Sequence, residues 1–114
     1  MGQLSINGTF STVPDPDWAS YGVRVVGAFV GGVAVRQGYE SGLLSFPPLS
    51  SAARNELYSR YMANRNSIVS GQIPQNSGYG WQFVSANFWE PLPTGYDGEW
   101  AHGVRMMVYR VQRF

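Results

Sequence analysis

Few residues in this chain could carry out chemistry. His102 is the only histidine, and the chain has no cysteine. A serine, histidine and aspartate triad would need His102 and a carboxylate such as Asp97, but no G-x-S-x-G motif or other nucleophile signature is present. One histidine without cysteine also argues against an ordinary zinc or iron site. We therefore expect a structural or hydrogen-bonding role for His102, no cofactor and no enzymatic activity.

Carboxylates offer two further kinds of chemistry. Asp15 and Asp17 in "PDPDW" look like a fragment of a calcium site, but the glycine and closing glutamate of a calcium loop are missing, which favours capping and turn roles. Glu90 and Glu99 flank one loop and could form the carboxylate pair of a glycoside hydrolase. Because acidic residues beside a loop rich in proline and glycine are common, hydrolysis is the weaker interpretation.

Composition indicates one folded domain over residues 1–114. Hydrophobic residues make up 44% and charged residues only 13%, which is too apolar for a disordered chain. All eight basic residues are arginine and the formal net charge is +1, so long-range attraction to nucleic acid or an anionic membrane is weak. The N-terminal sequence has no positively charged region followed by an apolar stretch, and we expect no secretory signal.

The stretch "VRVVGAFVGGVAVRQG", residues 23–38, has three interpretations. A membrane helix needs about 20 apolar residues, but Arg24 and Arg36 bracket too short a segment. A phosphate-binding loop needs a helix after its glycines, whereas a second β-type run follows here. A hairpin turning at Gly31 and Gly32 fits best, since glycine allows the positive φ of tight hairpin turns. This hairpin would pair Val30 with Val33 and Phe29 with Ala34. Farther from the turn it would pair Gly27 with Arg36.

One helix is predicted from about residue 51 to residue 69. Ser50 or Ser51 can cap it after two prolines, and Gly71 suits its end. Glu56 and Arg60 are spaced for an i, i+4 ion pair on the exposed side. Apolar residues recur at spacings of three and four along one stripe: Leu57, Tyr58, Tyr61, Met62, Ile68 and Val69.

The remaining segments read as strands, giving an α+β fold that is mostly antiparallel sheet or sandwich. The first strand lies in residues 3–13, with a bulge at Gly8, and the last two lie in residues 79–90 and 101–114. In the last strand Met106 faces one side, while Met107, Tyr109 and Val111 face the other. A strand that is apolar on both faces is covered on both, by its own domain or by another chain.

Aromatic residues gather around the loop "EPLPTGYDGEW". They are Trp81, Trp89, Tyr96 and Trp100. Burial at the rim of a small domain would explain them, and so would a flat platform for sugar rings. A protein interface is a third explanation, because aromatic residues, methionine and arginine are enriched at interfaces and lysine is depleted. The interface candidates in the last strand are Met107, Tyr109, Arg105, Arg110, Arg113 and Phe114.

In its general character the chain is similar to the small structural proteins of bacteriophage virions, such as capsid decoration or cement proteins and small neck or tail components. No motif supports this resemblance, so no functional residue is carried over from it. It implies a non-enzymatic role in a symmetric particle, assembled in the host cytoplasm, with partners that are further copies of the chain or other virion proteins. The competing hypothesis is a carbohydrate-binding β-sandwich module whose aromatic platform binds a glycan.

Overall fold

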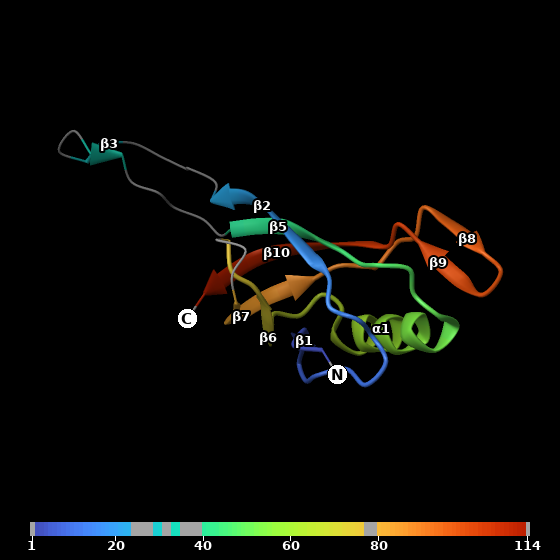
Figure 1. The fold of residues 1–114 in the computed structure, drawn as a ribbon. Helices are drawn as coiled ribbons and strands as arrows, with labels where there is room; N and C mark the ends of the chain where they lie inside the picture. The colour runs from blue at the N-terminus through green and yellow to red at the C-terminus, as the bar shows by residue number, and fades with distance from the viewer. Residues whose placement is uncertain (1, 24–28, 31–32, 35–39, 77–79, 114) are drawn as a thin grey trace.

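A six-stranded antiparallel sheet forms the centre of the molecule (Figure 1). The computed structural model describes residues 2–23, 29–30, 33–34, 40–76 and 80–113. In sheet order the strands are β1 Ser5–Ile6, β6 Val69–Pro74, β7 Trp81–Phe88, β10 Arg105–Arg113, β5 Glu40–Ser45 and β2 Asp17–Val23. Two short hairpins add β3 Phe29–Val30 with β4 Val33–Ala34, and β8 Gly95–Asp97 with β9 Trp100–His102. With α1, Ser51–Asn64, the described chain has the α+β fold that the sequence predicted.

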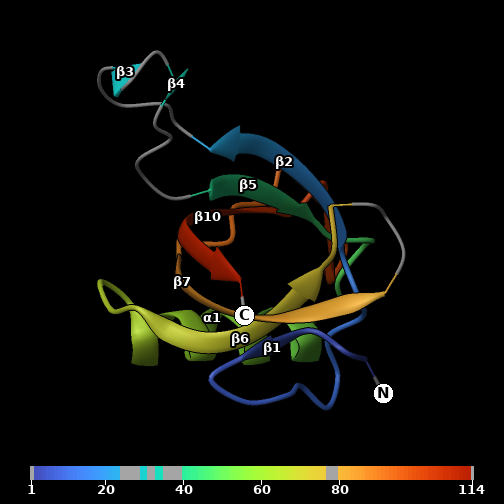
Figure 2. The same cartoon turned by 90° about the vertical axis from the view of Figure 1, so that its left-hand side faces the viewer.

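The sheet curls around its own inner face, as Figure 2 shows along the strands. The curl brings the end of β6 close to the start of β2, although the two strands lie near opposite edges of the sheet. A side-chain hydrogen bond joins the two regions, because the Trp18 indole Nε1 donates to the Asn76 Oδ1 over 2.8 Å. Strands of a single curved sheet therefore face one another across the core.

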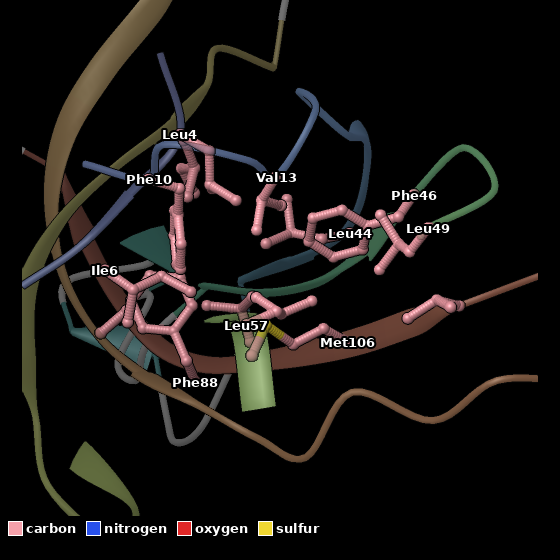
Figure 3. Packing of buried hydrophobic residues seen from close by; sticks show 14 of the residues in the cluster. Leu4, Ile6, Phe10, Val13, Leu44, Phe46, Leu49, Leu57, Phe88 and Met106 are labelled. Carbon is pink, nitrogen blue, oxygen red and sulfur yellow. The ribbon is translucent and has the colours of Figure 1, made fainter. Parts of the chain in front are cut away.

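The core lies between the inner face of the sheet and α1 (Figure 3). Leu57 of α1 is 1% exposed and points toward Met106 of β10, which is fully buried. Residues two apart in a strand share a face, and the inner face therefore carries alternate residues of each strand. The buried apolar set includes Leu4, Ile6, Phe10, Val13, Leu44, Phe46, Leu49, Ile73, Val84, Phe88, Val104 and Val108.

Helix α1 begins where the sequence predicted but ends earlier. The Ser50 side chain accepts a hydrogen bond from the Ala53 amide, which satisfies a free donor of the first turn. The helix stops at Asn64 rather than near residue 69, because Arg65 already has an extended backbone with ψ of 145° and Asn66 a left-handed one with φ of 63°. The prediction that Ile68 and Val69 belong to the helical stripe is therefore wrong. Val69 opens β6.

Three further predictions about the helix are wrong: the stop at Gly71 and the burial of Tyr58 and Met62. Gly71 lies inside β6, where a side chain would collide with the Ser5 carbonyl oxygen and contact the Phe88 ring. Tyr58 and Met62 of α1 are 44% and 41% exposed, so they do not belong to the core. The stripe that packs on the sheet is narrower than predicted and is formed by Ala53, Leu57 and, in part, Tyr61.

The predicted hairpin is confirmed where the chain is described. Val30 pairs with Val33 and Phe29 pairs with Ala34, as expected. Gly31 and Gly32, where the turn was predicted, lie outside the described residues. The outer pair, Gly27 with Arg36, lies outside the described residues. Strands β2 and β5 pair with each other before and after this hairpin, and β3 lies beyond their ends in Figure 1.

The N-terminal segment is held against α1 by two residues that the sequence placed in an ion pair. The Arg60 guanidinium donates to the carbonyl oxygens of Ile6, Gly8 and Thr9 over 2.6 to 3.1 Å. The Glu56 carboxylate instead accepts from the backbone and hydroxyl groups of residues 11 and 12. Glu56 and Arg60 thus bind the N-terminal segment instead of each other. The first strand ends at Ile6, because Asn7 has a left-handed backbone with φ of 54°.

Candidate functional site

The outer face of the central strands carries an apolar patch, which we call the outer patch. It consists of Ala19 of β2, Leu43 of β5, Met107 and Tyr109 of β10, and Trp89, which follows β7. Ala19 pairs with Leu43 and Leu43 pairs with Met107, so these three form a row across the sheet. The Trp89 amide donates to the Met107 carbonyl over 2.9 Å, and the rings of Trp89 and Tyr109 lie 4.6 Å apart. Helix α1 lies on the other side of β5 and β10 (Figure 1).

The outer patch remains open to solvent despite its apolar character. Trp89 is 52% exposed, and Leu43, Met107 and Tyr109 are half-buried. Phe83 of β7 is 67% exposed. This row is contiguous, whereas most exposed apolar residues on a protein are scattered singly.

A β-bulge at Arg110 decides which residues of β10 reach the outer patch. Between Tyr109 and Gln112 the strand has one residue more than β7 opposite it, and Arg110 has a left-handed φ of 55°. The extra residue reverses the alternation of sides beyond it. Val111 is consequently buried on the inner face, at 4% exposure. The prediction that it shares a face with Met107 and Tyr109 is therefore wrong.

Arg113, one of the interface candidates, points inward for the same reason. Its guanidinium donates to Glu40 of β5, to the Pro74 carbonyl of β6, to Gln82 of β7 and to Asn76, over 2.9 to 3.2 Å. It also lies 5.7 Å from the ring centre of Trp18. Arg113 thus ties together four segments at one end of the curved sheet, and we call this set of contacts the arginine clasp. The Arg113 guanidinium is therefore engaged by groups of its own chain.

Glu40 supplies the charge that balances Arg113. Its side chain is 8% exposed and that of Arg113 is 15% exposed. Burial acts to raise the pKa of the Glu40 carboxyl, but hydrogen bonds from Arg113 and Ser20, together with the positive charge of Arg113, outweigh it and hold that pKa below its ordinary value. Glu40 is therefore ionised at neutral pH, and the pair is a neutral unit inside the fold.

The other interface candidates of β10 have different surroundings. Arg105 and Arg110 are exposed, and the backbone of Arg105 pairs with Leu92. Both lie in the strand that carries Met107 and Tyr109, and they form a charged rim to the outer patch. Phe114 lies outside the described residues.

The four aromatic-loop candidates are distributed over three places. Trp89 belongs to the outer patch. Tyr96 and Trp100 lie on the β8–β9 hairpin, where they are 60% and 45% exposed. Tyr96 lines a groove of about 330 Å³ between α1 and residues 90–93, and the Arg54 guanidinium lies 5.1 Å from its ring centre. We call this the helix groove. A single aromatic platform built from the four residues is not present.

Trp81 lines a second groove together with Trp18, where the end of β6 approaches the start of β2. This seam groove has a volume of about 400 Å³. Its other lining residues are Pro16, Asp17, Pro74, Gln75, Asn76 and Gly80. The seam groove combines two indole rings with a carboxylate and two amides, which no other described groove does.

The candidates for catalysis remain isolated. His102 Nε2 and Asp97 Oδ2 are 4.0 Å apart on the exposed β8–β9 hairpin, and in the described chain no hydrogen bond joins a serine to His102. Asp15 caps the N-terminal segment, since its Oδ1 accepts from the Gln3 and Leu4 amides. Among the described residues no group of three histidines or carboxylates is placed to hold a metal ion.

The residues of these surfaces that the sequence missed include Leu43, Trp18 and Gln75. Leu43 joins the outer patch, and its signal was the pair of leucines in "ESGLLS", one for each face of a strand. Trp18 and Gln75 line the seam groove. A tryptophan beside a proline-rich turn was a visible signal for Trp18, but nothing in the sequence relates it to Trp81, 63 positions later (81 − 18).

The chain was compared with protein-family models, with curated proteins and with solved structures, and none of the three comparisons gave a match. In the described part of the chain, no helix has the length and apolar character needed to cross a bilayer.

Proposed function

We propose that this chain is a non-enzymatic structural protein of a larger symmetric particle, and that the outer patch is where it contacts a second copy of itself. The virion of a bacteriophage is the particle that fits the general character of the chain best. The observation that carries the proposal is the open row of Ala19, Leu43 and Met107 across the sheet, extended by the stacked rings of Trp89 and Tyr109.

The composition of the outer patch supports a contact between proteins. Interfaces have an apolar, aromatic centre and a rim in which arginine is common and lysine is rare. Here Trp89, Tyr109 and Met107 form the centre, and Arg105 and Arg110 lie in the same strand at the rim. The exposed half of Trp89 and the exposed parts of Met107 and Tyr109, with their flanking arginines, supply the area of this contact, for which a specific interface requires roughly 1,000 Å² in total.

A second copy is the occupant that the sheet geometry favours. A face presented by regular strands can pack against the same face of another copy, as sheets do in sandwiches. Contacts between like faces close with two-fold symmetry, which is the commonest symmetry of homo-oligomers. The buried set on the inner side, including Met106 and Val108, leaves the outer side chains free for this contact.

The test is the mass of the protein in solution. We expect the parent chain to sediment as an oligomer and Met107→Glu to shift it to the monomer, because a charge would be buried in the contact. Arg110→Glu should weaken association less, since Arg110 lies at the rim. Ser59→Glu on the exposed side of α1 adds the same charge elsewhere and should leave the oligomer intact. A parent chain that stays monomeric at high concentration, or a folded Met107→Glu protein that associates normally, would overturn the proposal.

A further inference from the structure

The seam groove has the features of a small-molecule site. It lies where the curled sheet brings the end of β6 to the start of β2 (Figure 2), and its lining residues include none of the outer patch. Its volume of about 400 Å³ falls in the range of about 300 to 1,000 Å³ that small-molecule sites occupy. Trp18 and Trp81 provide apolar walls, and Asp17, Gln75 and Asn76 provide polar ones.

The wall formed by Trp18 is held in place from three directions. Its indole Nε1 donates to Asn76 Oδ1 over 2.8 Å, and the Arg113 guanidinium lies against its ring. Gly42 of β5 lies against the far edge of the ring, where any side chain would collide with it. A wall fixed before binding loses little conformational entropy when a ligand arrives.

The remaining polar groups of the groove are available to a ligand. Asn76 is already engaged with Trp18 and Arg113. In the described chain, by contrast, no hydrogen bond is formed by the Asp17 carboxylate, the side-chain amide of Gln75 or the Trp81 indole N–H, although all three residues line the groove. Together they offer acceptors at Asp17 and Gln75 and donors at Gln75 and Trp81.

We propose that the seam groove binds a neutral saccharide, with the Trp81 and Trp18 rings against the sugar's C–H faces and Asp17, Gln75 and Trp81 Nε1 against its hydroxyls. Hydroxyl groups both donate and accept, and the groove offers both kinds of partner. A phosphate or acidic sugar is disfavoured, because Asp17 is the charged group that lines the groove and the charge of Arg113 is balanced by Glu40. A quaternary ammonium ion would leave the donors of Gln75 and Trp81 without acceptors.

The experiment is a titration followed by amide chemical shifts and tryptophan fluorescence. The probes are the common neutral hexoses, deoxyhexoses and N-acetylhexosamines, with choline and inorganic phosphate as contrasting ligands. We expect at least one neutral sugar to bind and to shift the amides of residues 16–18 and 74–76. The spectrum of each protein also reports whether it is folded.

Matched variants locate the binding. Trp81→Ala should weaken it about tenfold or more, since it removes a stacking surface. Gln75→Ala, which leaves the apolar walls intact, should weaken it by about threefold to tenfold through loss of hydroxyl partners. Trp100→Ala removes an exposed tryptophan from the β8–β9 hairpin and should change nothing.

Three outcomes would overturn the proposal. They are the absence of binding by any sugar of the panel, binding that survives in folded Trp81→Ala and Gln75→Ala proteins, and preferential binding of choline or phosphate. The inference does not depend on the proposed assembly. Met107→Glu should keep the saccharide affinity of the parent chain whether or not it loses association.

Discussion

Two pairs of glutamate and arginine tie distant parts of this chain together, and they do so in opposite ways. In the arginine clasp, Glu40 and Arg113 bind each other inside the fold, with side chains 8% and 15% exposed. On α1, Glu56 and Arg60 lie one turn apart and bind the N-terminal segment separately, through hydrogen bonds that are mostly exposed. The same two residue types thus serve once as a buried ion pair and once as two independent surface anchors.

The difference between the pairs shows how burial sets the strength of a charge contact. A surface pair gains little, because water solvates each charge nearly as well as its partner does. A buried pair depends on both members, because removing one leaves the other charge without solvent or partner. The arginine clasp should therefore be the costlier of the two to break.

The largest effect is expected from Arg113→Ala. This change leaves the buried Glu40 carboxylate without its charge partner and removes the hydrogen bonds to Pro74, Gln82 and Asn76, so the free energy of unfolding should fall by about 3 kcal/mol or more. Chemical denaturation measures it. Arg105→Ala, on the same strand but exposed, is the control and should change stability by less than about 0.5 kcal/mol. Equal losses in the two variants would contradict the distinction between the pairs.

A smaller effect is expected at low pH, where Glu56 becomes protonated. Hydrogen bonds from the Thr12 hydroxyl and the Ser11 amide are the main factors that lower the pKa of Glu56 from 4.5 to about 2. Because this pKa is lower in the folded state, the stabilisation is fully present above pH 4.5 and is lost as the pH falls toward 2. The site is largely exposed, so solvent screening limits the effect to about 1 kcal/mol.

Amide exchange at residues 11 and 12 reports on the release of this segment. The parent chain should show faster exchange between pH 4.5 and 2, relative to amides in β7 at the same pH. Glu56→Gln should show the faster exchange already at neutral pH and lose its dependence on acid in this range. Protection that is the same in the two proteins at pH 7 would rule out an anchoring role for Glu56.

The smallest effect is expected at the bulge that turns Arg113 inward. A non-glycine residue in the left-handed region costs about 1 kcal/mol, and Arg110 has a φ of 55°. Arg110→Gly should therefore raise the melting temperature slightly, by the equivalent of about 0.5 kcal/mol after the entropy of glycine in the unfolded chain is included. Gln112→Gly, at a strand position, should lower it. A loss of stability in both variants would show that the bulge does not carry this strain.

Much of the candidate outer patch could be predicted from sequence. Alternation in β10 separated Met106 from Met107 and Tyr109, and these two residues do lie on the face opposite the core. The sequence also singled out Trp89, but assigned it to the aromatic loop. Its place beside Tyr109 follows only from the hydrogen bond between its amide and the Met107 carbonyl. The seam groove could not be predicted, since Trp18 and Trp81 meet only through the curl of the whole sheet.

What the sequence alone determined about this protein is local. The proline pair and Ser50 determined where α1 begins, and the glycine pair between two β-type runs predicted the pairing of Val30 with Val33, because backbone preferences act between neighbouring residues. Only the tertiary structure decided that α1 ends at Asn64, that Val111 and Arg113 face inward, and that Glu56 and Arg60 bind the N-terminal segment instead of each other. These outcomes depend on contacts between residues far apart in the chain, whose energies outweigh the small preferences that spacing along the sequence can express.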